Sequence, residues 1–110
     1  MAKFITIGYG DRSGYDQTSE NLRSRAHESD RKLRDQGALI GIAGKPVQVR
    51  NTQNIKLTTT DAPFMSSALP VAGFAVIEAE NLSDAISMVG ETPCAIAYGV
   101  VEVWPIETMQ

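Results

Sequence analysis

Two side chains are the best candidates for transferring a proton: an aspartate in a short motif and the only histidine. Asp61 begins the tetrapeptide Asp61-Ala62-Pro63-Phe64, and His27 lies in a charged segment without glycine or proline. A carboxylate or an imidazole acts as a general acid or base when its pKa is tuned to the working pH. We therefore take Asp61 and His27 as the candidate catalytic residues.

Four further residues complete a candidate ligand-binding set: Tyr9, Asp11, Arg50 and Phe64. Arg50 ends a predicted strand, where its planar guanidinium could clamp a carboxylate. Simpler structural roles exist for some of these candidates. Asp61 can fix a turn through its own backbone, Phe64 can anchor the loop in the core, and Arg50 can protect a strand edge.

Several other site chemistries are not indicated. The glycines at 8, 10 and 14 follow a predicted strand, but their spacing is G-x-G-x-x-x-G and differs from that of a dinucleotide-binding loop. The chain has one histidine and one cysteine, so no cluster of these residues points to a metal site. Cys94 has no neighbouring base to activate it as a nucleophile. We expect neither a metal nor a cofactor.

The composition is that of an ordinary globular protein. Hydrophobic residues make up 43% of the 110 residues and the formal net charge is −3, with both signs mixed along the chain. No basic stripe is present, so we expect no nucleic acid partner. No segment approaches the roughly 18 apolar residues that span a bilayer, so we expect no membrane association. A single cysteine excludes an internal disulfide and suits a reducing compartment, which favours a cytoplasmic location.

The elements that must position these residues follow from periodicity and turn signals. Thr18 or Ser19 caps the first predicted helix and Gly37 ends it, and Asn81 caps the second. Turn-rich loops are expected at 8–14 and 60–70. Strands are predicted at 2–9, 38–43, 47–50, 55–59, 71–79 and 95–104, and helices at 18–36 and 81–89.

This order predicts one α+β domain over residues 1–110. A strand and a helix come first, several strands follow, and a strand–helix–strand unit ends the chain. The pattern suits an antiparallel sheet with two helices on one face, the ferredoxin-like arrangement. Such a sheet leaves its other face uncovered.

The motifs resemble those of the YCII-related (DGPF-type) family. Residues 61–64 are similar to the Asp-Gly-Pro-Phe signature, and residues 9–11, 72–77 and 98–105 resemble family segments in the same order. The resemblance implies that two ferredoxin-like sheets pair into a dimeric α+β barrel, so the expected partner is a second copy of this chain. It implies a small-molecule-binding protein whose pocket lies near the signature loop and the dimer interface.

Two alternatives stay open. Some members of the family carry a histidine on the first helix paired with an aspartate, and one is a dehydrochlorinase, so a lyase-type proton transfer is the first alternative. In this chain the family position of the histidine falls on Ala26, and Thr92 stands where the aspartate is expected. One residue is about 100° of helix rotation, which turns His27 toward solvent. Asp30 either orients His27 or pairs with Arg34. A non-catalytic structural or partner-binding dimer is the second alternative.

Overall fold

Four antiparallel strands form the central sheet of the computed structural model, which describes residues 1–107. The sheet order is β2-β5-β1-β6. Counted by their appearance in the chain, these strands run 2-3-1-4, which is the split βαβ arrangement of ferredoxin-like folds. The predicted α+β class and ferredoxin-like topology are confirmed, and the predicted domain also includes residues 108–110, which lie outside the described part. The four strands are β1 (Ala2–Tyr9), β2 (Leu39–Ile42), β5 (Val71–Ala79) and β6 (Val100–Pro105).

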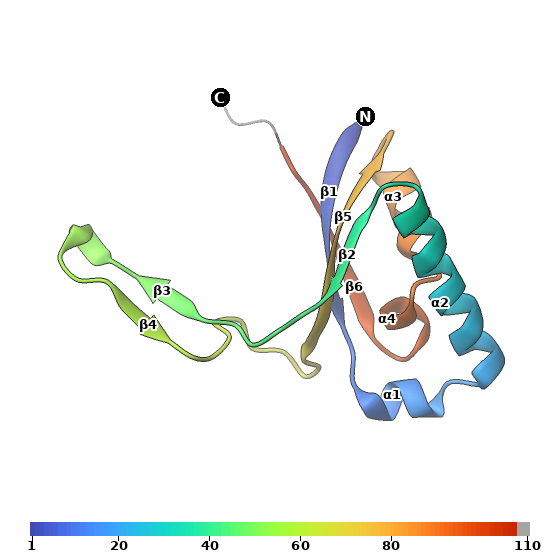
Figure 1. Ribbon diagram of the computed structural model, residues 1–110, viewed down its shortest axis with the longest axis horizontal. Helices are drawn as coiled ribbons and strands as arrows, with labels where there is room; N and C mark the ends of the chain where they lie inside the picture. Colours follow the sequence, from blue (N-terminus) through green and yellow to red (C-terminus); the bar gives the residue numbers. More distant parts are fainter. Residues whose placement is uncertain (108–110) are drawn as a thin grey trace.

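Helices cover one face of this sheet (Figure 1). The two predicted helices are α2 (Glu20–Asp35) and α3 (Leu82–Val89). Their predicted caps are present: the Ser19 hydroxyl accepts a hydrogen bond from the Leu22 backbone N–H, and the Asn81 side chain accepts one from Asp84. These caps satisfy backbone donors that a helix start otherwise leaves without a partner.

Two short helices lie where the sequence indicated a loop and a strand. The Asp11 carboxylate accepts a hydrogen bond from the Gly14 backbone N–H at 2.8 Å and begins α1 (Arg12–Gln17). Pro93 opens α4 (Pro93–Ile96), a position that suits its fixed φ angle. Tyr98 then has a positive φ of 61°, so the last strand starts at Val100 and not at residue 95. The start of α4 was not recognised in the sequence because the apolar residues that follow Pro93 favoured a strand.

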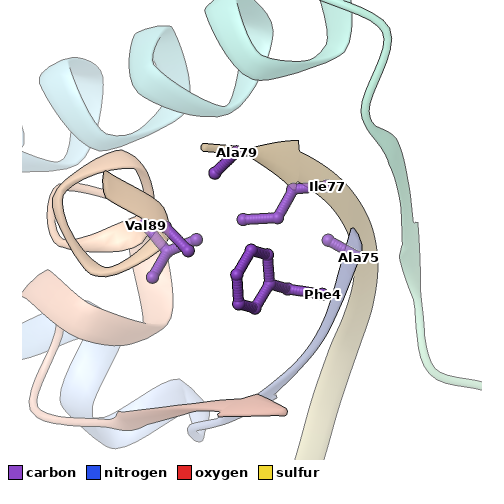
Figure 2. Close-up of a cluster of buried hydrophobic side chains, with 6 residues drawn as sticks. Phe4, Ala75, Ile77, Ala79 and Val89 are labelled. Atoms are coloured by element: carbon purple, nitrogen blue, oxygen red, sulfur yellow. The ribbon is translucent and has the colours of Figure 1, made fainter. Parts of the chain in front are cut away.

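The core lies between the sheet and α3. Phe4 of β1 points to the same side as Ile77 and Ala79 of β5, and Val89 of α3 packs against them (Figure 2). Ile77 is 1% exposed, which makes it the most buried of the larger side chains. Side chains alternate along a strand, so every second residue of β1 points away from the helices.

The other face of the sheet is apolar and uncovered. Ile5 pairs across the strands with Trp104 and with Val76, and Val76 in turn pairs with Leu39 on β2. Leu39 is 72% exposed and Trp104 is 52% exposed. We call this surface the open face; its large exposed side chains are Ile5, Leu39, Phe74, Val100 and Trp104.

A hairpin stands away from the rest of the fold (Figure 1). It consists of β3 (Gln48–Arg50) and β4 (Thr58–Thr60), which pair with each other in a separate two-stranded sheet. A 3-10 turn, η1 (Thr52–Asn54), lies at its tip, where Gln53 and Asn54 have positive φ angles. Because of this turn, the strand that was predicted at 55–59 begins only at residue 58. We call residues 44–69 the arm.

Among the described residues, no helix combines the length and the apolar composition needed to cross a bilayer.

Candidate functional site

The six residues that the sequence predicted for a site lie in three separate places. His27 lies on α2 and Asp11 at the start of α1, both beside a cavity. Tyr9 ends β1 and bonds a residue of the neighbouring strand β6. The other three lie on the arm: Arg50, Asp61 and Phe64.

On the arm, the signature loop packs only against its own hairpin. The Gln48 amide donates a hydrogen bond to the Ala62 carbonyl at 3.0 Å, and the Arg50 guanidinium lies over the Phe64 ring at 5.8 Å. Phe64 is 79% exposed, so the expectation that it anchors the loop in the core is wrong. Asp61 is exposed, and a small hollow of about 330 Å³ beside it is lined by Arg50 and Phe64 without Asp61.

Tyr9 takes part in a cluster next to the open face. Its hydroxyl donates a hydrogen bond to Glu102 Oε1 at 2.7 Å, and the Trp104 indole N–H lies 3.4 Å from the same oxygen. The hydrogen bond to Glu102, with burial second, raises the pKa of Tyr9 above its usual value. A tyrosine with a raised pKa stays neutral, so this residue is a hydrogen-bond donor rather than a base.

A large cavity lies between α2 and the helix side of the sheet. Its volume is about 710 Å³. Strands β1, β2 and β5 form its floor with glycine, alanine and isoleucine, and α4 contributes Pro93, Cys94 and Ala97. Polar side chains line the side formed by α1 and α2: Asp11, Arg12, Tyr15, His27, Asp30 and Arg34.

Glycines let other parts of the chain pack closely against the floor of this cavity. A Cβ atom on Gly8 would lie 2.8 Å from the Cys94 sulfur, and one on Gly73 would lie 2.8 Å from the Gly41 carbonyl oxygen. Both contacts are too close for a real side chain. Gly8 therefore allows Cys94 of α4 to lie directly against β1, and Gly73 allows β2 to lie close to β5.

On the side of the cavity formed by α1 and α2, Tyr15 and His27 form a direct contact. The Tyr15 hydroxyl lies 2.8 Å from His27 Nε2, and the two ring centroids are 5.8 Å apart. The Arg23 guanidinium lies over the Tyr15 ring at 5.0 Å, an attraction between a cation and the ring face. His27 is exposed, as predicted, yet it also lines the cavity, and its hydrogen-bond partner is Tyr15 rather than Asp30.

Asp30 lies about one turn beyond His27, where it is partly buried. Burial raises the pKa of its carboxyl group, while the charges of Arg34 and His27 oppose that rise. Among the described residues, no ion pair within 4.0 Å joins Asp30 to Arg34, so the predicted helix-surface pair is not formed; Arg31 instead pairs with Glu28 and Asp35.

Cys94 lies in the wall of the cavity. Burial raises the pKa of its thiol, and the negative charge of Asp30 raises it further. It therefore stays a thiol at neutral pH, and the thiol is far less nucleophilic than the thiolate. Burial thus favours the neutral forms of both Cys94 and Asp30.

Sequence reasoning missed Tyr15 because it did not predict α1. A sequence signal was present, because aspartate is a preferred N-cap residue. Asp11 begins the helix by accepting a hydrogen bond from the Gly14 backbone N–H, three residues further on. With the helix placed at 12–17, Tyr15 comes within reach of α2.

Within the part of the chain that the structure describes, no group of three or more histidine, cysteine, aspartate or glutamate side chains is arranged to hold a metal ion. A scan against models of known protein families and a search of curated proteins both found no match for this chain. Membership of the YCII-related family stays a prediction, and the function must be argued from the cavity.

Proposed function

We propose that this chain is a small-molecule-binding protein of the YCII-related kind, and that its ligand occupies the cavity between α2 and the sheet. The observation that carries the proposal is a space of about 710 Å³ with an apolar floor and polar side chains along the side formed by α1 and α2. Ligand pockets are typically about 300–1,000 Å³, largely apolar, with a few placed polar groups that fix orientation. The proposed site uses α1 and α2, and not the signature loop at 61–64.

The free polar groups restrict the ligand chemistry. Asp11 caps α1, and Arg12 lies 3.4 Å from Asp16, so both are engaged within the chain. Arg34 has no ion pair within 4.0 Å among the described residues, and the Tyr15–His27 pair offers further hydrogen bonds. These groups suit a compact apolar or aromatic molecule with one anionic or hydrogen-bonding end, such as a small carboxylate, a phenol or a quinone.

A thermal-shift screen of such molecules tests the proposal. A ligand at about 100 times its dissociation constant stabilises the folded state by roughly 2.7 kcal/mol, which is a rise of several degrees in a domain of this size. Arg34→Met should abolish the shift. The control Arg25→Met changes an exposed arginine of the same helix that does not line the cavity, so it should keep the shift. A shift that survives Arg34→Met but disappears in Asp61→Asn would place the ligand on the arm and contradict the proposal, and a screen without hits would favour a non-catalytic partner-binding dimer.

A second candidate function is lyase-type proton transfer, favoured by the 2.8 Å contact between Tyr15 and His27 at the cavity. In such a reaction a base takes a proton from carbon, the electron pair of that C–H bond forms a double bond, and a leaving group departs with its own electron pair. His27 would take the proton, with Tyr15 orienting its ring. Screening hits incubated with the protein and followed by NMR would reveal turnover. His27→Gln should stop turnover and leave binding intact, whereas turnover at the wild-type rate would exclude His27 as the base.

We also propose that the chain forms a homodimer through the open face, as the family resemblance implies. Ile5, Phe74 and Trp104 give this face its large apolar surface, which water would otherwise cover at a cost. The proposal includes a reducing cytoplasmic location, because Cys94 is a free thiol. The mass in solution at micromolar concentration tests the dimer, and a monomeric mass would contradict it.

A further inference from the structure

The arm contributes no residue to the buried core cluster. Its two short strands pair only with each other in the sheet, and an isolated two-stranded hairpin is marginally stable in water at best. Six of its large hydrophobic side chains are more than half exposed: Val47, Val49, Ile55, Leu57, Phe64 and Met65. So many exposed apolar side chains on a thin extension point to a contact with another molecule.

The exposed surface of the whole chain sets an upper bound on the area that such a contact can bury. The chain exposes 8145 Å², while a compact monomer of 11.9 kDa exposes about 5,950 Å². The radius of gyration is 16.0 Å, against about 13 Å for a compact domain of this length. The excess is about 2,200 Å² per chain. Burying that area on two copies removes about 4,400 Å², which lies in the range of obligate homodimers.

The direction of the arm points to the same partner. In Figure 1 the arm extends from the side of the sheet opposite the helices, which is the side of the open face. A two-fold dimer uses the same surface on both copies. When two copies pair through their open faces, each arm therefore extends toward the other copy.

Charge also favours a second copy. The arm carries Lys45, Arg50 and Lys56 against the single acid Asp61, a net charge of +2. The whole chain has a net charge of −3, so the remainder carries −5. A basic arm and an acidic body attract each other across a dimer, and such complementarity orients an encounter.

From these observations we propose that the arm is a clasp, which packs its apolar residues against the body of a second copy of this chain. The inference rests on the proposed homodimer and adds the surface that completes it. The clasp also places Arg50, Asp61 and Phe64 against the partner rather than against their own sheet.

The test compares paired charge substitutions by sedimentation equilibrium. Ile55→Asp with Leu57→Asp changes two exposed side chains of the arm, and should raise the dimer dissociation constant about 100-fold or more, because two apolar contacts are lost. The control Leu82→Asp with Ile86→Asp changes two exposed side chains of α3 and should leave it unchanged. A wild-type dissociation constant in the arm variant overturns the clasp.

A third variant separates the clasp from the dimer itself. Trp104→Asp places a charge on the open face and should dissociate the dimer without touching the arm. If Trp104→Asp dissociates the protein and the arm variant does not, the homodimer stands and the clasp fails; a monomeric wild-type protein overturns both. Limited trypsin digestion gives an independent readout. Cleavage after Lys56 should be slow in the wild-type protein and fast in Trp104→Asp, and equal rates would contradict docking of the arm.

Discussion

The cavity and the arm both hold residues that the sequence suggested for a site, and they differ in what lies next to those residues. At the cavity, Asp11 caps α1, and His27 contacts Tyr15 beside an apolar space. On the arm, Asp61 and Phe64 are exposed, and Asp61 does not line the small hollow beside it. The motif is on the arm, and the cavity of about 710 Å³ is in the body.

The difference shows that surroundings, as well as residue type, set the protonation state that a side chain favours. Burial raises the pKa of Asp30 and of Cys94, and neither belongs to a recognisable motif. Perturbed groups of this kind in a cleft are what functional sites have in common. Four predictions test whether the body and the arm differ as described, from the largest effect to the smallest.

The first prediction compares apolar truncations. Ile77→Ala in the core should lower the free energy of unfolding by about 2–5 kcal/mol, because it leaves a cavity among fully buried side chains. Phe64→Ala on the arm should cost less than about 1 kcal/mol in the dissociated chain. Chemical denaturation over a range of protein concentrations measures both. A loss for Phe64→Ala that grows with concentration belongs to the dimer, and a large loss independent of concentration would contradict the exposed position of Phe64.

The second prediction compares two glycines. A Cβ on Gly99 would lie 2.1 Å from the Tyr9 carbonyl oxygen and 2.6 Å from that of Cys94, so Gly99→Ala should destabilise the fold by about 2 kcal/mol or more. Gly44, at the start of the arm, has open space around it. Gly44→Ala should change stability by less than about 1 kcal/mol. The melting temperatures of the two variants, followed by circular dichroism, test this prediction. Equal losses of stability for Gly99→Ala and Gly44→Ala would show that the two regions are packed alike.

The third prediction compares two thiols. Burial and the charge of Asp30 raise the pKa of Cys94, so alkylation by iodoacetamide at pH 8 should be at least about tenfold slower than for an exposed thiol. The reference is Ser66→Cys with Cys94→Ser, which moves the only thiol to the arm. Mass spectrometry gives both rates. A ligand bound in the cavity should slow Cys94 further and leave the arm cysteine unaffected.

The fourth prediction concerns the pH dependence of Asp30. The pKa of Asp30 is raised, which means that the folded state binds its proton more tightly than the unfolded state does. The free energy of unfolding therefore falls as the pH rises from the pKa in the unfolded chain through the pKa in the folded protein. Asp30→Asn removes this cost. It should raise the melting temperature by about one to two degrees at pH 7, with no gain near pH 3, where both states of the wild-type residue are protonated. Asp61→Asn on the arm should give less than about one degree at either pH, and a gain at pH 3 would reject burial of the Asp30 charge as the cause.

Much of the fold was readable because local patterns were strong. The alternation and apolar run at 71–79 matched β5 to the residue, and Ser19 and Asn81 capped the helices as predicted. The short helices α1 and α4 were not predicted, because each is only a few residues long and therefore too short to show a periodic pattern. Their start signals, Asp11 and Pro93, lie next to glycine-rich and apolar stretches that favoured other interpretations.

The candidate site was only partly readable. Asp11 and His27 were suggested by type and do line the cavity, while Tyr15 depended on a helix that was not foreseen. The grouping of Asp61 with Tyr9 and Asp11 does not occur within one chain, because residues 44–69 leave the sheet as an arm. A motif shows that residues are close in the chain, and it does not show which distant segment they meet.

The sequence by itself determined the class of fold, the main strands and the two longer helices, because these follow from local propensity and period. Tertiary structure decided where a cavity opens, which side chains meet beside it and how far the arm stands from the body. Those features depend on contacts between residues far apart in the chain, such as Tyr15 with His27 across two helices and Gly8 with Cys94 across the floor. Only the packed chain brings such pairs together, and burial in the cavity wall raises the pKa of Cys94.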